Sequence, residues 1–233
     1  MKIALLGYGK MGKTIENWAL QKGHEVVYKA TGAHEEGSFD KAHVAIEFSI
    51  PEAAVKNINR CFDKGIPVVC GTTGWLKEYD KVLKNCKKRN GSFIYASNFS
   101  VGVNLFFNLN EYFAQLMEPW KDYTPSIEEI HHTQKKDAPS GTAITLAEGV
   151  LKFSEKKDWS LDPKDSDKLS INALREGDVK GTHSIEYRSN IDTLSIKHEA
   201  HSRDGFALGA ILAAEWLVDK KGVFSMKDVL NLN

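Results

Sequence analysis

Residues 3–12 read Ile3-Ala4-Leu5-Leu6-Gly7-Tyr8-Gly9-Lys10-Met11-Gly12, and this stretch decides the fold. A short apolar run ends in glycines with the spacing G-x-G-x-x-G, and apolar residues then recur at helical intervals as far as Ala19. A strand, a glycine-rich turn and a helix in this order open a β-α-β unit. The pattern predicts a parallel sheet of the Rossmann type at the start of the chain.

The same alternation of strands and helices continues to about residue 100. Further apolar strands are predicted at 24–30, 44–48, 67–70 and 93–96. We therefore expect residues 1–100 to form a dinucleotide-binding domain with an α/β fold.

The pattern changes after Asn98. Helices are predicted at 103–117 and 142–153, and strands at 127–132, 183–187 and 194–198. Residues 154–168 are charged and poor in apolar side chains, so a surface loop is expected there. Residues 101–205 are thus expected to form a second α+β domain that carries a mixed, largely antiparallel sheet. The pattern leaves open on which domain the apolar helix beginning near Gly205 packs.

The bulk composition is that of an ordinary globular enzyme. Lys plus Arg and Asp plus Glu number 31 each, so no overall charge favours nucleic acid or an anionic membrane. The three cysteines lack C-x-x-C spacing, which favours packing thiols in a reducing compartment over disulfides or a zinc site. No signal segment precedes the first strand, and no apolar run has the length of a membrane span. A cytoplasmic location is the expected default.

The glycine loop has the chemistry of a dinucleotide site. Gly7 allows a tight turn, Gly9 lets a phosphate approach the backbone, and Gly12 allows close packing of helix on strand. The helix N-terminus favours the pyrophosphate charge. The expected cofactor contacts are Gly7, Tyr8, Gly9, Lys10, Met11 and Gly12. The alternative is a glycine-rich turn that binds nothing.

The second predicted strand lacks the acid that usually binds a ribose 2′-hydroxyl. Lys29, Ala30 and Thr31 occupy its end, and the first carboxylate is that of Glu35. Without an acid a 2′-phosphate is not repelled, and Lys29 could attract it. NADPH is therefore expected to be accepted at least as well as NADH. Alternatively, Lys29 is an ordinary solvated lysine.

Two more loops follow predicted strands of the same sheet. Ligands of open α/β sheets bind outside the carboxyl ends of the strands. This rule adds further expected contacts on the nicotinamide side: Gly71, Thr72 and Thr73, and Ala96, Ser97, Asn98 and Phe99. Without that context each loop would be merely a turn.

Residues 131–143 read His-His-Thr-Gln-Lys-Lys-Asp-Ala-Pro-Ser-Gly-Thr-Ala and form the second functional segment. His131 and His132 can serve one cleft only if the strand ends or twists there, because neighbouring strand residues face opposite ways. Ser140 is a suitable helix N-cap, and the amides near Gly141 and Thr142, with the Thr142 hydroxyl, could hold a carboxylate. Lys135 would add charge attraction. We expect a seat for a small substrate that bears one or more carboxylates.

A histidine beside lysines can act as a general acid near the working pH. Hydride delivery to an electron-poor carbon leaves an anion that needs a proton, which links this segment to the glycine loop. The competing interpretation is a structural histidine and a solvated face at Lys135 and Lys136. Metal binding is not expected, because no standard ligand spacing occurs among His131, His132, His183, His198 and His201.

The segment H-H-x-x-K-x-D-A-P-S-G-T-A also carries a resemblance to a known family. Together with GYGKMG, CGTTGW, ASNFSVGVN, REGDVKGTH and FSMKDVLNL, it resembles the 4-hydroxy-tetrahydrodipicolinate reductases, also called dihydrodipicolinate reductases, of lysine and diaminopimelate biosynthesis. The matching stretches run from one end of the chain to the other.

The resemblance implies an NADPH- or NADH-dependent oxidoreductase that replaces the 4-hydroxyl of its substrate by hydrogen, through water loss and hydride addition. It implies His131 as the catalytic proton donor or acceptor and Lys135 as a proton donor. The implied substrate contacts are His132, Gly141 and Thr142, and Ser140 at the expected helix start is added to them. It further implies a homotetramer paired through sheets of the second domain, and it places residues 206–233 back on the nucleotide domain.

The chain departs from the family in three respects. It is shorter than the commoner form, mainly between the second and third strands, and it lacks the acidic residue after the second strand. Thr133 and Gln134 replace basic residues. Two rival functions remain: another NAD(P)-dependent reductase or dehydrogenase of an amino-acid pathway, and a nucleotide-sensing binding protein. The histidine–lysine segment argues against both.

Overall fold

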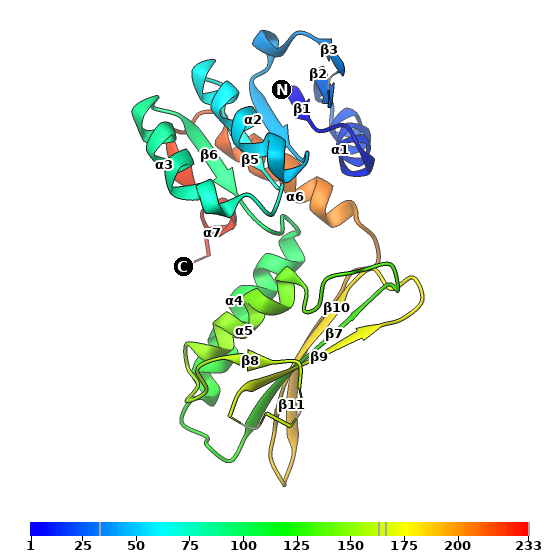
Figure 1. The fold of residues 1–233 in the computed structure, drawn as a ribbon, viewed down its shortest axis with the longest axis vertical. Helices are drawn as coiled ribbons and strands as arrows, with labels where there is room; N and C mark the ends of the chain where they lie inside the picture. Colours follow the sequence, from blue (N-terminus) through cyan, green and yellow to red (C-terminus); the bar gives the residue numbers. More distant parts are fainter. Residues whose placement is uncertain (33, 163, 166, 233) are drawn as a thin grey trace. The chain divides into compact units, whose positions relative to one another are not determined.

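The computed structural model describes residues 1–32, 34–162, 164–165 and 167–232. The chain divides into two compact units, of which the first comprises Met1–Val101 and Asp204–Asn233 and the second Gly102–Arg203 (Figure 1). Among the helices of the described ranges, none combines the length and the hydropathy needed to cross a bilayer.

The first unit is built on a seven-stranded sheet with the order β12-β6-β5-β4-β1-β2-β3. The strands are β1 (Lys2–Leu6), β2 (Glu25–Thr31), β3 (His34–Gly37), β4 (Val44–Glu47), β5 (Val68–Cys70), β6 (Ser92–Tyr95) and β12 (Gly222–Phe224). Neighbouring strands are parallel except for the antiparallel pair β2 and β3. The strand order reverses between β1 and β4, and open α/β sheets bind their ligands at such a reversal.

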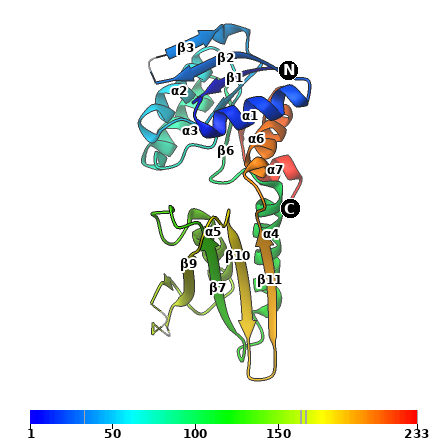
Figure 2. The ribbon, with the colours of Figure 1, turned by 90° about the vertical axis from the view of Figure 1, so that its right-hand side faces the viewer.

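Helices cover both faces of this sheet, which explains why its central strands are continuous apolar runs. The helices are α1 (Lys10–Gln21), α2 (Pro51–Asp63), α3 (Tyr79–Lys88), α6 (Asp204–Leu217) and α7 (Met226–Leu230), with short 3₁₀ turns at Phe39–Lys41 and Leu76–Glu78. Ala4 and Leu6 of β1 face the core under α2 and α3, whereas Ile3 and Leu5 face the core under α1 and α6. Helices α1 and α6 lie side by side (Figures 1 and 2).

The second unit is a five-stranded mixed sheet with two helices on one face. Its strands are β7 (Thr124–His131), β8 (Trp159–Ser160), β9 (Leu169–Arg175), β10 (Thr182–Arg188) and β11 (Thr193–Glu199), and its helices are α4 (Val101–Met117) and α5 (Gly141–Leu151). The order is β11-β10-β7-β9-β8, with β10 antiparallel to β7 and β11, and β9 parallel to β7 and β8. Ile127, two residues before Glu129 on β7, is buried in the core with Phe106 of α4 and Leu146 of α5.

The predicted fold class is confirmed, with a parallel Rossmann-type sheet followed by a mixed sheet. The three cysteines are buried and unpaired, as predicted. The expected loop at 154–168 is wrong in part, because Trp159 and Ser160 form β8 by pairing with Leu169 and Ser170; residues 163 and 166 of that segment lie outside the described residues. Strands β3, β9 and β12 were not predicted.

Candidate active site

The glycine loop connects β1 to α1, and each of its glycines has a different surrounding. Gly7 has φ +101°, and a Cβ there would lie 2.0 Å from the carbonyl oxygen of Phe48. A Cβ on Gly12 would lie 2.3 Å from the Gly7 oxygen. The fold itself therefore requires glycine at both positions. Gly9 differs, since no heavy atom lies within 4 Å of the place where its Cβ would be. The fold leaves this side of the loop open.

A pocket of about 270 Å³ lies at the carboxyl ends of β4 and β5. It is lined by Met11, Phe48, Ser49, Pro51, Gly71, Thr72 and Thr73. Four residues expected from the sequence thus meet at one pocket, and Phe48, Ser49 and Pro51 were missed. Phe48 and Ser49 come directly after the buried strand β4, so the rule that ligands bind at the carboxyl ends of strands could have identified them.

The loop after β6 is less open. Phe99 is buried against the Phe48 ring, with 5.8 Å between the ring centroids, and Asn98 accepts a hydrogen bond from the Ser100 amide at 2.9 Å. Ala96 is half-buried and Ser97 is exposed. The Phe99 side chain packs in the hydrophobic core of the first unit.

Lys29 is not a freely solvated lysine. Its Nζ lies 2.6 Å from Oε1 of Glu16 and 5.0 Å from the centroid of the Tyr8 ring, and the Tyr8 hydroxyl donates to Glu16 as well. The hydrogen bond with Glu16 raises the pKa of Lys29 above its ordinary value. Glu16, on α1, was missed by the sequence analysis, and it neutralises the lysine expected to attract a phosphate. Glu35, the first carboxylate after β2, is bound by Arg60 at 2.8 Å.

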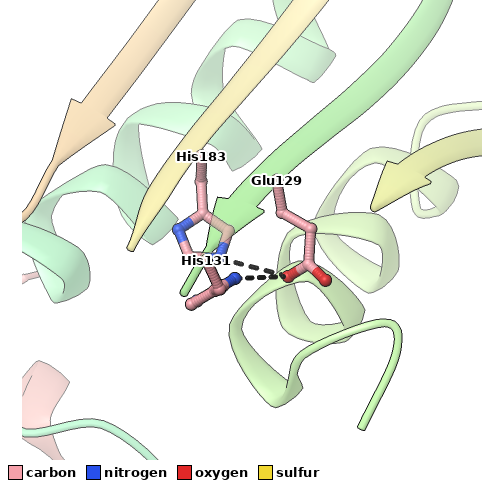
Figure 3. Close-up of side chains that lie close together, drawn as sticks. All are labelled: Glu129, His131 and His183. Carbon is pink, nitrogen blue, oxygen red and sulfur yellow. Dashed lines mark ion pairs between the residues drawn. The ribbon is translucent and has the colours of Figure 1, made fainter. Parts of the chain in front are cut away.

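In the second unit, adjacent strands bring together a buried polar cluster (Figure 3). Glu129 and His131 are two residues apart on β7 and so share a face. His183 on β10 pairs with Glu129, and Arg175 on β9 pairs with His131. The Glu129 carboxylate is 3.5 Å from His131 Nδ1, 3.6 Å from His183 Nε2 and 3.1 Å from the Arg175 guanidinium. Glu129, His183 and Arg175 were not among the expected site residues, because only the strand register joins them.

Burial and charge set the ionisation of this cluster. Burial acts to raise the pKa of Glu129, but the contacts with His183, Ser140 and Arg175 outweigh it and hold the pKa at about 2. Burial lowers the pKa of His131 to about 4; the Glu129 carboxylate opposes this shift, and the nearby His183, Lys135 and Arg175 add to it. In the free protein at neutral pH, Glu129 is therefore ionised and the His131 imidazole is uncharged.

The N-terminus of α5 is fastened to the same carboxylate. The Ser140 amide donates to both oxygens of Glu129 at 3.1 Å, and the Ser140 hydroxyl caps the helix by accepting from the Ala143 amide at 3.1 Å. The same hydroxyl is 3.2 Å from His183 Nε2. Gly141 is exposed with open space beside its Cα, and Thr142 is half-buried. The predicted N-cap is thus confirmed.

Residues 132–139 form the loop between β7 and α5. Lys135 is mostly covered and binds the Asp137 carboxylate at 2.7 Å. The Arg175 guanidinium, which also binds Glu129, donates to the Asp137 carbonyl at 2.6 Å. His132 lies just past the end of β7, half-buried and 3.5 Å from Arg203. Strand β7 therefore ends between the two histidines. This is the condition under which both side chains could face one cleft.

Glu129, His131 and His183 are also close enough to hold a metal ion, since one ligand atom from each lies within 4.8 Å of the others. The strand register creates this cluster, and a search for spacing along the sequence could not find it. The carboxylate already binds the Arg175 guanidinium and the Ser140 amide, so a cation would have to compete with a fixed positive charge.

Comparison with known proteins gives a consistent family match over both units. Residues 1–99 match the family described as dihydrodipicolinate reductase, N-terminus, and residues 102–230 match dihydrodipicolinate reductase, C-terminus. The chain is 54% identical to the 4-hydroxy-tetrahydrodipicolinate reductase of Christiangramia forsetii over 99% of its own length and 98% of the relative's. It is 34% identical to the enzyme of the same name from Archaeoglobus fulgidus, over 99% of this chain and 100% of that one.

Solved structures share the fold. A dipicolinate-bound dihydrodipicolinate reductase from Paenisporosarcina sp. superposes with a TM-score of 0.77 at 19% identity, covering 100% of this chain and 99% of the other. An aspartate dehydrogenase from Thermotoga maritima superposes with a TM-score of 0.54 at 12% identity, over 96% of this chain and 99% of the other. At these identities the likeness is one of fold alone.

Proposed function

The chain belongs to the dihydrodipicolinate reductase family, and we propose that it reduces 4-hydroxy-tetrahydrodipicolinate to tetrahydrodipicolinate with NADPH or NADH. The reaction consumes one hydride and one proton and releases the 4-hydroxyl as water. It serves lysine and diaminopimelate biosynthesis. Among the rivals, a nucleotide-sensing protein would have no use for the buried histidine cluster, and a reductase of another pathway would not match the family over both units.

One observation of the structure carries this proposal. His131, the expected proton-transferring group, and Ser140, the start of the expected carboxylate seat, both lie against the single buried carboxylate of Glu129, which is 3.5 Å from His131 Nδ1 and accepts from the Ser140 amide at 3.1 Å. A proton donor and an anion seat are therefore fixed relative to each other within one rigid unit, which a dicarboxylate reductase needs.

The glycine loop and the pocket beside it fit a nicotinamide dinucleotide. Gly9 leaves the space that a pyrophosphate would fill, and the N-terminus of α1 favours its charge. The proposed contacts are Gly7 to Gly12, Gly71 to Thr73 and Ala96 to Phe99, with Lys29 near the adenosine ribose. The nicotinamide ring supplies the hydride. Thr72 and Ser49 border the pocket. The Thr72 hydroxyl accepts a hydrogen bond from the Ser49 amide at 2.8 Å, which links the loops after β4 and β5.

The substrate carboxylates bind at the N-terminus of α5. Gly141 is exposed and offers the approach, Thr142 adds a hydroxyl, and Ser140 holds the first turn in place. Lys135 gives charge attraction once it exchanges Asp137 for a substrate carboxylate. His132 contacts the substrate from the end of β7.

His131 handles the proton. Its imidazole is uncharged in the free protein, because burial lowers its pKa to about 4. A bound dicarboxylate brings two negative charges, which favour protonation of the imidazole and counteract the burial. His131 then acts as the acid beside the reacting ring, and Lys135 is the second proton donor. This order makes proton uptake a consequence of substrate binding.

The remaining roles follow the two units. Residues 1–100 with 206–233 form the dinucleotide-binding domain, and residues 101–205 bind the substrate and form the contacts of a homotetramer. We place the enzyme in the cytoplasm, as expected from its composition.

The test of this function is an NADPH- and NADH-oxidation assay with freshly generated 4-hydroxy-tetrahydrodipicolinate. His131→Gln should lower kcat by about 10²-fold or more, the usual contribution of a general acid, while the Kd for NADPH stays the same. Lys135→Met should lower kcat and also raise KM, because a carboxylate partner is lost. Turnover of a different 2-oxo or imino acid, with none of this substrate, would disprove the proposal.

The same assay settles the cofactor. Because Glu16 neutralises Lys29, we expect NADH and NADPH to give kcat/KM values within about tenfold of each other, a difference of ~1.4 kcal/mol. Glu16→Gln should shift the ratio toward NADPH by freeing Lys29. Lys22→Met, at the other end of α1, is the matched control. A strong NADH preference that Glu16→Gln leaves unchanged would contradict a role for Lys29.

A further inference from the structure

Glu129 is a completely buried carboxylate in the site, and the proposed chemistry does not use it directly. We propose that Glu129 is a positioning residue for catalysis: it fixes the orientation of the His131 imidazole and allows this ring to take up the proton that the reaction consumes. The inference rests on the proposed function and adds a residue to it.

The geometry favours an aligned pair over an incidental contact. Glu129 and His131 lie on the same face of β7, and the carboxylate is 3.5 Å from Nδ1 of the imidazole. Nδ1 is buried and has no hydrogen-bond partner in the free protein. Catalytic hydrogen bonds are often long in free enzymes and tighten when substrate binds. A small rotation of the ring would therefore complete a bond from Nδ1–H to Glu129.

The other ring nitrogen, Nε2, is the one that we assign to the substrate. Gly181 packs beside it, and a Cβ on Gly181 would lie 3.2 Å from His131 Nε2. A proton on Nδ1 that points at a carboxylate fixes the tautomer, so that Nε2 is the nitrogen that gains and loses the transferred proton. Glu129 would thus decide which nitrogen does the chemistry.

The charges around His131 give Glu129 a second effect. The groups that face the ring are Glu129 on its own strand, His183 on β10, Arg175 on β9 and Lys135 in the following loop. Glu129 alone among these favours a charged imidazole, and the other three disfavour it. Without this carboxylate the ring would face only neutral or positive neighbours. Protonation of His131 would then require a lower pH.

Two further contacts anchor the carboxylate. Arg175 and the Ser140 amide hold Glu129 from two other sides at 3.1 Å. Because the same amide begins α5, the orientation of the imidazole and the position of the carboxylate seat are set by one group. Hydrogen bonds from fixed donors also keep the carboxylate ionised.

The first experiment compares Glu129→Gln with Glu128→Gln by steady-state kinetics from pH 5 to 9. Glu128 makes the matched control, because it is the neighbouring residue of β7, on the opposite face, and bonds to Asn172 at 3.0 Å. Glu129→Gln should lower kcat by about 30-fold or more while the Kd for NADPH is unchanged. The pH limb of kcat assigned to His131, which reports this ring in the substrate complex, should also move to lower pH, because the group that raises the His131 pKa is gone. Glu128→Gln should change neither.

A loss of kcat in Glu129→Gln with a pH profile that superimposes on the wild type would reduce Glu129 to a structural role and overturn the proposal. An unchanged kcat would overturn it as well. Glu129→Asp keeps the charge with a shorter reach, so we expect its pH profile to stay close to that of the wild type even if kcat falls. A profile displaced as far as that of Glu129→Gln would contradict the charge argument.

A second measurement does not use Glu129→Gln, in case that variant does not fold. Imidazole ¹⁵N shifts, assigned by the signals missing in His131→Gln, report the tautomer of His131 with and without pyridine-2,6-dicarboxylate as a substrate mimic. We expect Nδ1 to carry a proton in both states, alone in the free protein and together with Nε2 where the bound dicarboxylate favours the charged ring. An Nε2–H tautomer in both states would overturn the proposal. This reading requires no turnover, so it distinguishes failure of the inference from failure of the proposed function.

Discussion

The behaviour of His131 shows how strongly burial can act on a single residue. Its side chain is 11% exposed, and burial lowers the pKa of the imidazole from an ordinary 6.5 to about 4 despite an adjacent carboxylate. A group in the folded state that resists protonation ties stability to pH. Burial of His131 is therefore expected to lower the free energy of unfolding at acid pH.

The folded-state pKa of His131 is lower than the unfolded value, so the neutral ring contributes fully above pH 6.5 and its contribution is lost as the pH falls toward 4. The largest loss is roughly 3 kcal/mol. We expect the unfolding free energy of the wild type to fall more steeply between pH 7 and 4 than that of His131→Gln, measured by urea denaturation at each pH. His34→Gln, at an exposed histidine of β3, should parallel the wild type. Parallel curves for His131→Gln would contradict the burial argument.

Glu129 adds to the same trend at lower pH. Its pKa is about 2 in the folded protein, below the ordinary 4.5, so the stability it confers is present above pH 4.5 and is lost as the pH falls through about 2. The pH range in which His131 affects stability lies above the range in which Glu129 does. One pH titration of the unfolding free energy therefore separates the two contributions.

At the scale of elements, the turn from β1 to α1 contains glycines that the fold requires and one glycine that we expect to serve cofactor binding. Gly7 and Gly12 are required by the backbone around them, whereas Gly9 has open space. Gly7→Ala should destabilise the protein by about 3 kcal/mol or more, because its Cβ would overlap the Phe48 carbonyl at a positive φ. Thermal unfolding without cofactor measures this loss.

Gly9→Ala should behave in the opposite way. The melting temperature of the cofactor-free protein should stay within about 2 °C of the wild type, since its Cβ meets nothing within 4 Å. The Kd for NADPH, measured by fluorescence titration, should rise by about tenfold or more because the added methyl group occupies the approach of the pyrophosphate. Unchanged NADPH binding would mean that the dinucleotide does not lie on this side of the loop.

Local patterns predicted the elements well where the periodicity was long. The strand before Gly7, the helix after it and the long helix that ends at Met117 were all readable from apolar spacing. Strand β8 was missed because it has two residues and exists only by pairing with β9. Strand β3 was missed because all four of its residues are exposed and so show no alternation.

The sequence predicted the site residues that lie within one segment, but not those that come from other strands. Sequence spacing identified His131, Lys135 and the N-cap Ser140 because they lie within one short segment. Their partners Arg175, His183 and Glu129 are joined by strand register, which a single sequence does not contain. Glu16 was missed for the same reason, since its pairing with Lys29 depends on how α1 packs on β2.

At the scale of the whole molecule, the second unit exposes large apolar side chains that an isolated protomer would leave in water. Ile191, in the turn between β10 and β11, is 91% exposed, and Leu194 at the start of β11 is 41% exposed. Strand β11 is also an edge of its sheet, with unpaired backbone groups. Both features favour covering this end of the sheet by another copy of the chain.

For the homotetramer that the family resemblance implies, we expect sedimentation equilibrium to give four times the chain mass of 26.0 kDa at micromolar concentration. Ile191→Lys should lower the average mass, because a charge would replace an apolar contact at this edge. Leu20→Lys, a similar exchange at a 56% exposed residue of α1, should leave the mass unchanged. A wild-type protein that sediments as a monomer would refute the tetramer. A tetramer that tolerates Ile191→Lys but not Leu20→Lys would move the contact to the nucleotide unit.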